Sequence, residues 1–175
     1  MWGPKVVLFA TLLTFPAVAQ MPAMNSMAAC PPQTAPLPDA LMAWGAPKTL
    51  TAATTDKRLA QAVLSLGQSA DVTLAPTPHV RYPLRPEKPG GSVSHGGLLS
   101  VSIPDAGTYR VALGTGAWID LVRDGKAIES SGHGPGPACT GLRKMVDFSL
   151  KKGSYVLQIA ANGTPTIRVM IIREP

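Results

Sequence analysis

Gly107-Thr108-Tyr109-Arg110-Val111-Ala112-Leu113 and Gly153-Ser154-Tyr155-Val156-Leu157-Gln158-Ile159 are two copies of one short pattern, and they decide the fold class. Each copy follows a tight turn and a segment, 99–103 or 146–150, in which apolar and polar residues alternate. Strict alternation is typical of half-buried antiparallel strands. Glycine after the turn gives the backbone conformations that other residues avoid. The sequence therefore predicts two β-hairpins, with Tyr109 and Tyr155 facing the core.

Further short strands are predicted on both sides of these copies. Asp124-Gly125 and Asn162-Gly163 are typical hairpin turns between neighbouring strands. Short strands with turns at this spacing favour an all-β, antiparallel, jelly-roll-like β-sandwich. Ser149 and Gln158 fall on the faces of their strands that point away from the core. Replacing either should therefore reduce stability much less than replacing a core residue such as Tyr155. The expected strands are 71–75, 98–103, 107–113, 117–123, 126–131, 143–150, 153–160 and 166–173.

The first part of the chain reads as an export signal followed by an arm. Lys5 precedes a short apolar run, and Ala17-Val18-Ala19 resembles a cleavage site, so residues 1–19 are expected to be removed. The run is shorter than the about 20 apolar residues that span a bilayer, so no membrane span is expected. Residues 20–50 should form an extended arm with a short helix near 39–44. The β-sandwich should occupy residues 51–175. Within it, residues 57–66 are predicted to form either a second short helix or the segment that leads into a strand.

Cys30 and Cys139 are the only cysteines of the chain. Two cysteines in an exported protein usually bond to each other, which would fasten the arm to the loop before strand 143–150. A competing interpretation makes Cys30 a lipidated N-terminus, because Met27-Ala28-Ala29-Cys30 loosely resembles a lipobox. The polar and proline residues between the apolar run and Cys30 favour the disulfide.

The strand pattern resembles that of a known domain group. The two Gly-x-Tyr strands, the segment Trp118-Ile119-Asp120-Leu121 and the Asp124-Gly125 turn resemble pre-peptidase C-terminal domains over about residues 98–173. That resemblance implies a β-sandwich accessory domain of a secreted bacterial enzyme. The whole chain also resembles small exported alphaproteobacterial proteins, some of which bear the name homogentisate 1,2-dioxygenase. The residues do not support that activity, because the chain is too short for the cupin subunit and lacks its His-x-x-x-x-x-Glu-x-x-His iron motif.

The charge pattern argues against nucleic acid as a partner. The formal net charge is +6 at pH 7, but the lysines and arginines are scattered and form no basic run with interleaved aromatic residues. The positive balance is compatible with solubility alone or with a preference for acidic surfaces or anionic polysaccharide.

Three histidines, His79, His95 and His133, raise the possibility of a metal site. Three imidazoles can hold a divalent transition metal such as zinc or copper. Their spacing fits no local metal motif, so the competing interpretation is three separate loop histidines. No cofactor is expected unless loops at one end of the sandwich bring the three together.

The proline-rich segment 76–97 is the least regular part of the chain, and a long loop in a compact domain is either functional or poorly ordered. Arg81, Tyr82 and Arg85 in this segment, with Trp118, are candidates for a ligand platform, because aromatic faces stack on sugars and cations. The alternative for Trp118 is packing in the core. No Gly-x-Ser-x-Gly nucleophile motif is present, and no catalytic residue is predicted.

These observations favour a secreted or periplasmic β-sandwich that binds a protein or glycan ligand through loops 76–97 and 130–142. One alternative is a small metal-dependent, dioxygenase-like enzyme that uses the loop histidines. Another is a structural or assembly subunit that docks a partner through the arm.

Overall fold

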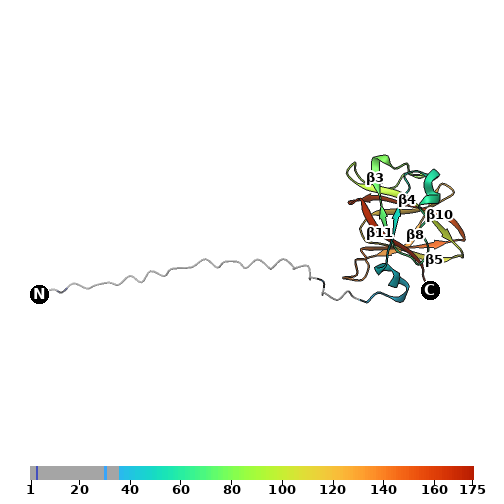
Figure 1. Cartoon of the computed structure of the whole chain (residues 1–175). Helices are drawn as coiled ribbons and strands as arrows, with labels where there is room; N and C mark the ends of the chain where they lie inside the picture. Colours follow the sequence, from blue (N-terminus) through green and yellow to red (C-terminus); the bar gives the residue numbers. More distant parts are fainter. Residues whose placement is uncertain (1–2, 4–29, 31–35) are drawn as a thin grey trace.

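The computed structural model describes Gly3, Cys30 and residues 36–175. It confirms the all-β sandwich: two sheets stack face to face, and every pairing is antiparallel except that of β1 with β2 (Figure 1). Sheet A contains, in spatial order, β1 (Lys48–Thr51), β2 (Ala70–Thr73), β11 (Thr166–Arg173), β5 (Gly107–Leu113), β9 (Lys144–Leu150) and β8 (Ser130–Gly134). Sheet B contains β3 (Ala75–Pro76), β4 (His95–Ile103), β10 (Gly153–Asn162), β6 (Trp118–Arg123) and β7 (Lys126–Ile128).

The two predicted hairpins around the Gly-x-Tyr copies are wrong in their pairing. β4 lies in sheet B and β5 in sheet A, so the turn between them crosses from one sheet to the other. The turn between β9 and β10 crosses in the opposite direction. The two copies pair with each other instead: β4 with β10, and β5 with β9. Each glycine pairs with the last residue of the strand that precedes the other copy, Gly107 with Leu150 and Gly153 with Ile103.

A hydrogen bond from a tyrosine side chain stabilises each of these crossings. The hydroxyl of Tyr109 donates to the carbonyl oxygen of Asp105 at 2.8 Å, and that of Tyr155 donates to the carbonyl oxygen of Lys151 at 2.8 Å. Each acceptor lies four residues before its tyrosine, inside the turn. A tyrosine that bonds back to the turn before its own strand also occurs at the corners of immunoglobulin-type sandwiches. Both rings are buried, so each residue fills the core and fixes the turn at once.

The core forms between the sheets from inward-facing residues of both repeats, such as Leu99, Val111, Val146 and Leu157. One side of the sandwich is closed by the segment after β1. Ala53 and Val63 form isolated bridges with β4, and Ala62 and Leu64 join the core. This segment contains the short 3₁₀ helix η2 (Asp56–Gln61), where the sequence predicted a helix or the lead into a strand.

Of the two predicted hairpin turns, one is confirmed and one is wrong. Asp124-Gly125 does form the turn of the β6–β7 hairpin, with positive φ at both residues. Asn162-Gly163 does not make a hairpin, because β10 and β11 belong to different sheets. The strand expected over 126–131 divides into β7 and β8, again in different sheets. The export signal 1–19 lies outside the described residues apart from Gly3, so it stays a prediction.

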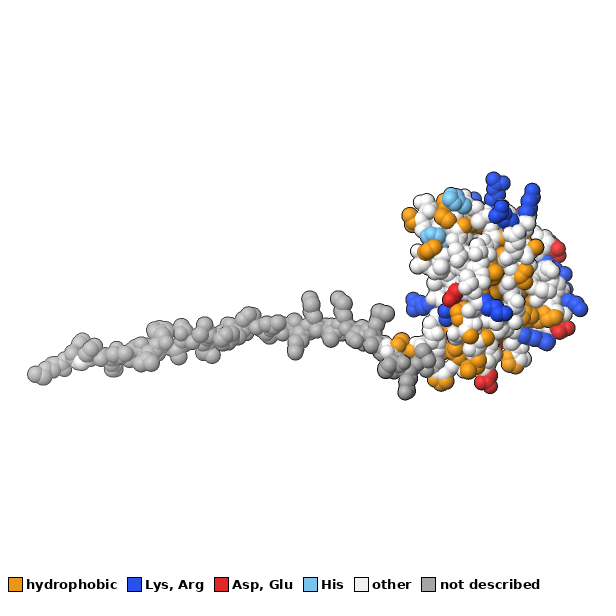
Figure 2. All heavy atoms as spheres, in the orientation of Figure 1, with side chains coloured by type: hydrophobic (Ala, Val, Ile, Leu, Met, Phe, Trp, Pro, Cys, Tyr) orange, Lys and Arg blue, Asp and Glu red, His pale blue; other side chains and the backbone are white. Residues whose placement is uncertain are grey.

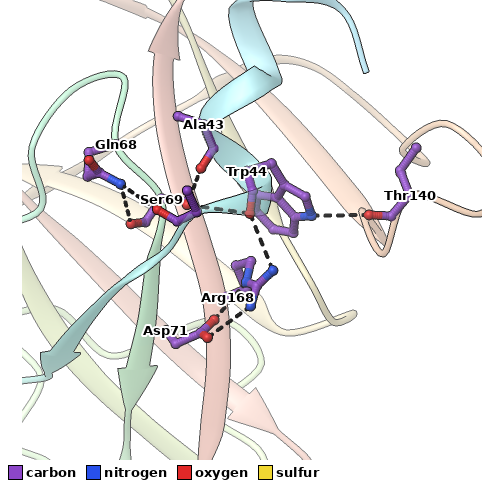
Figure 3. A network of polar contacts seen from close by, with 8 residues as sticks. Ala43, Trp44, Gln68, Ser69, Asp71, Thr140 and Arg168 are labelled. Atoms are coloured by element: carbon purple, nitrogen blue, oxygen red, sulfur yellow. Dashed lines mark hydrogen bonds and ion pairs between the residues drawn. The ribbon is translucent and has the colours of Figure 1, made fainter. Parts of the chain in front are cut away.

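The described part of the arm covers the outer face of sheet A. The 3₁₀ helix η1 (Asp39–Gly45), blue in Figure 1, buries Leu41 and Trp44 against a second apolar cluster. Polar contacts hold it there (Figure 3): the Trp44 indole N–H donates to the Thr140 carbonyl, and the Arg168 guanidinium donates to the Trp44 carbonyl. Arg168 also forms a two-pronged ion pair with Asp71, its cross-strand partner. The cluster consists of Leu41, Trp44, Ala112, Leu142, Met170 and Ile172.

A disulfide joins the arm to the same region. Cys30 and Cys139 are bonded, with their Cα atoms 5.3 Å apart. Cys139 immediately precedes Thr140, whose carbonyl receives the Trp44 indole. The covalent link and the Trp44 contact therefore act on one loop, and together they hold the arm on sheet A.

We predict that breaking the disulfide loosens the arm and destabilises the domain. Cys30→Ser/Cys139→Ser should lower the free energy of unfolding by about 2–5 kcal/mol, because the bond closes a long loop in the unfolded chain. The measurement is a thiol count on the unfolded, non-reduced protein, followed by thermal melts with and without reductant. Two free thiols, or a melting temperature unchanged by confirmed reduction, would contradict the prediction.

Candidate functional site

The proline-rich segment crosses the outer face of sheet B and is held there by hydrogen bonds. The sequence alone left open whether this segment is functional or poorly ordered. The Gln158 side chain of β10 bonds twice to the Leu84 backbone: its carbonyl oxygen accepts from the Leu84 N–H, and its amide donates to the Leu84 carbonyl, both at 3.0 Å. We call residues 80–90 the proline strap. Gln158 is fully buried beneath it. The sequence predicted that Gln158 faces outward and therefore tolerates substitution. This side chain is not exposed, because the proline strap, which is distant in sequence, covers it.

Tyr82 fastens the strap at a second point. Its hydroxyl donates to the Ile159 carbonyl of β10 at 3.0 Å. The ring lies over Gly96 of β4, where any Cβ would collide with the tyrosine hydroxyl. Burial raises the pKa of Tyr82 to about 12, so the phenol stays neutral at ordinary pH. Tyr82 thus holds the strap in place, and this contact differs from the ligand platform that the sequence suggested.

A groove of about 720 Å³ opens on the side of the sandwich where the chain passes from β7 to β8. These are the edge strands of the two sheets, and the described chain leaves the space between them partly uncovered. Ile119, Val146 and Phe148 of the core reach the groove. The proline strap contributes Glu87 and Lys88 to its lining. We call this space the Trp118 groove.

Trp118, at the start of β6, carries the most distinctive contacts of the groove. The residue is partly exposed, so it is not packed wholly within the core. Its indole N–H donates to the Asp120 carboxylate at 3.0 Å. Two ammonium groups lie over its ring, with Lys88 Nζ 5.0 Å and Lys144 Nζ 5.5 Å from the centroid. Both distances are within the range of cation–π attraction.

Asp120 and Lys144 are both partly buried at this place. Burial raises the pKa of the Asp120 carboxyl, against the lowering effect of hydrogen bonds from Trp118 and Gln158. Burial, and then the charge of Lys88, lower the pKa of Lys144. Lys144 Nζ donates one hydrogen bond, to the Ala117 carbonyl at 3.1 Å. The groove therefore contains two charged groups, Asp120 and Lys144, whose burial is only partly offset by their hydrogen bonds with the protein.

The structure brings together only some of the candidates from the sequence. His133 and Trp118 both line the groove, whereas Arg81 and Arg85 are exposed on the strap and do not contribute to its lining. His95 lies on β4 of sheet B and His133 on β8 of sheet A. Within residues 36–175 no group of three His, Cys, Asp or Glu side chains is placed to hold a metal ion.

Sequence reasoning did not identify Glu87, Lys88 or Lys144 as residues of a site. Asp120 and Trp118 sit two residues apart on one strand face, and this spacing is the local signal for their shared environment. Nothing local in the sequence indicates that Lys88, in an irregular loop, reaches the same ring. That contact depends on the path of the strap over sheet B.

A second hollow of about 410 Å³ lies beside Trp44 on the other sheet. Its charged residues, Asp71 and Arg168, are paired with each other. It offers fewer unsatisfied groups than the Trp118 groove. Figure 2 shows lysine and arginine side chains spread around the visible face of the domain rather than gathered over one element.

No family model matches the sequence, and no curated protein does either. One similar solved structure is the pre-peptidase C-terminal domain of collagenase from Bacillus anthracis, with a TM-score of 0.40 and 14% identity over 63% of this chain and 92% of that chain. Another is a β-glucosidase from Paenibacillus barengoltzii, with a TM-score of 0.28 and 18% identity over 71% of this chain and 13% of that chain.

Among the described residues, no helix has the length and apolar character needed to cross a membrane.

We predict that Gln158 holds the proline strap in place. Gln158→Ala should lower the free energy of unfolding by about 1–3 kcal/mol, because it leaves the Leu84 N–H and carbonyl without their partners. Amide exchange at Leu84 should become faster. Ser149→Ala, on the exposed face of β9, is the matched control and should change stability by less than about 0.5 kcal/mol. Equal effects of the two substitutions would show that the strap is not fastened by Gln158.

Proposed function

We propose that this chain is an exported β-sandwich binding module whose Trp118 groove holds a saccharide ligand. The observation that carries the proposal is the position of Trp118. It is a partly exposed aromatic ring in an open groove, beside side chains that can donate and accept hydrogen bonds. Aromatic faces stack on the apolar faces of sugar rings, and nearby polar groups set orientation.

The arrangement of the rest of the domain supports the choice of this site. The 3₁₀ helix η1 packs on the outer face of sheet A, and the proline strap crosses the outer face of sheet B. Both loops that the sequence nominated for recognition contribute to the groove, the first through Lys88 and the second through His133. A volume of about 720 Å³ falls within the range of sites for small ligands, which favours a short saccharide over a folded protein surface.

The groove also supplies partners for sugar hydroxyl groups. The carboxylates of Asp120 and Glu129 accept hydrogen bonds, and the Ser130 hydroxyl can donate or accept them. Asp120 is held in position by the Trp118 indole, so ring and acceptor form one prearranged unit. Prearranged groups lose little conformational freedom when a ligand binds, which favours affinity.

Export is the second part of the proposal. The disulfide supports it, because such bonds persist in oxidising compartments. The predicted signal at residues 1–19 supports it as well. The mature chain would then begin at Gln20, and the arm would reach the sandwich through Cys30.

The two competing hypotheses make different predictions. A metal-dependent enzyme that uses His79, His95 and His133 requires stoichiometric metal that is lost when one histidine is replaced. An assembly subunit that docks through residues 20–50 requires association of the mature chain into larger particles. Metal analysis and size-exclusion chromatography of the mature protein address these alternatives.

We predict that Trp118→Ala abolishes saccharide binding without unfolding the domain. Calorimetric titration with soluble neutral and acidic oligosaccharides should show affinity about 30-fold weaker or undetectable, the effect of removing a central aromatic anchor. Trp118→Phe keeps an aromatic face and should retain part of the affinity. Thermal melts of all variants control for folding. Wild-type protein that binds no oligosaccharide, or a Trp118→Ala variant that binds as wild type does, would contradict the proposal.

A further inference from the structure

We infer that the saccharide in the Trp118 groove is acidic, and that its carboxylate binds between the ammonium groups of Lys88 and Lys144 beside the Trp118 ring. This inference rests on the proposed function, because it names the chemical class of the ligand for that same groove. It assigns a specificity role to two lysines that come from separate parts of the chain.

The two lysines converge on one ring from different elements. Lys88 belongs to the proline strap, which reaches the groove after its fastening at Leu84 by Gln158. Lys144 begins β9 in the other sheet. Their Nζ atoms lie 5.0 and 5.5 Å from the Trp118 centroid. Like charges repel, so two ammonium groups gathered at one aromatic residue leave a place that an anion would stabilise.

Within the described residues neither lysine forms an ion pair with a carboxylate, although the charge of Asp120 acts on Lys144 from a greater distance and raises its pKa. Within residues 36–175, the ion pairs involve arginines with Asp71, Asp124, Asp147 or Glu174, and neither Lys88 nor Lys144 takes part. Lys144 donates one hydrogen bond, to the Ala117 carbonyl, and an ammonium group has three N–H donors. Two donors of Lys144 are therefore available to a ligand.

The carboxylates of the groove do not fill this position. Asp120 accepts hydrogen bonds from the Trp118 indole at 3.0 Å and from the Gln158 amide at 3.4 Å, so it is engaged with its own sheet. Glu87 and Glu129 line the groove but are exposed to solvent, and neither forms an ion pair within the described residues. They remain available as acceptors for sugar hydroxyl groups while the lysines take the anion.

The state of Lys144 supports the same ligand. Burial and then the charge of Lys88 lower its pKa, and the charge of Asp120 opposes this shift without cancelling it, so the charged form of Lys144 is only partly compensated in the free protein. An anionic group at this place restores that compensation through short, charge-assisted hydrogen bonds, which are stronger than neutral ones. A uronic acid supplies a carboxylate for the two ammonium groups and an apolar ring face that can contact the exposed part of Trp118.

The test compares acidic sugars with neutral forms that differ only at the carboxylate. Calorimetric titrations use oligomers of galacturonate, glucuronate and mannuronate, each beside its methyl ester. A sulfated oligosaccharide forms a further arm that separates recognition of sulfate from that of carboxylate. The variants are Lys88→Gln/Lys144→Gln and the charge-matched control Lys151→Gln/Lys152→Gln, which alters two exposed lysines at the β9–β10 turn.

We predict that wild-type protein binds at least one uronate oligomer about tenfold or more tightly than its methyl ester, and that added salt weakens the binding. Lys88→Gln/Lys144→Gln should reduce this preference to about twofold or less while its melting temperature stays near that of wild type. Lys151→Gln/Lys152→Gln should keep the full preference.

Each contrary result has one meaning. Equal binding of acid and ester by wild-type protein overturns the acidic ligand but leaves saccharide binding intact. Tighter binding of the sulfated sugar than of every uronate overturns the carboxylate as the recognised group. A preference that survives in the Lys88→Gln/Lys144→Gln variant overturns the assignment to these lysines. Absence of binding to every saccharide overturns the proposed function itself.

Discussion

The structure depends on two tyrosine hydroxyls that bond back to the turns before their own strands. Tyr109 bonds to the carbonyl of Asp105, and Tyr155 bonds to the carbonyl of Lys151. Each turn carries the chain from one sheet to the other, so these contacts fix the two crossings of the sandwich. The four strands that meet at the crossings then pair between repeats, β4 with β10 and β5 with β9. Because both rings are buried, the same side chains also fill the core between the layers.

The candidate site follows from what covers this sandwich. The 3₁₀ helix η1 lies on sheet A through Trp44 and Arg168, and Cys30 is bonded to Cys139 in the adjoining loop. The proline strap lies on sheet B through Tyr82 and Gln158. These segments leave the groove at the β7–β8 side open, and the strap places Lys88 over the same Trp118 ring that Lys144 contacts. A segment that holds one face of the domain thus also builds part of the proposed binding site.

The sequence predicted most strand positions because alternation is a local property. β5 and β11 have the predicted bounds, and Tyr109 and Tyr155 face the core as expected. Alternation does not say whether the next strand joins the same sheet, since a tight turn can close a hairpin or cross between layers. The glycine-tyrosine pair after each turn was the available signal for a crossing, because a buried tyrosine needs a partner for its hydroxyl.

The site was less predictable because its contacts are non-local. Trp118 was named from its residue type, and its neighbour Asp120 lies two residues away on the same strand face. Gln158 was expected to be exposed because the period of its strand placed it outward, and only the strap, more than seventy residues away in sequence, buries it. Lys88 reaches the ring for the same reason. The most direct test of this account is the free energy of unfolding of Tyr109→Phe and Tyr155→Phe, measured by urea denaturation against wild type. The account predicts a loss of about 1–3 kcal/mol for each, since removal of one hydroxyl leaves a turn carbonyl without its partner; variants as stable as wild type would contradict it.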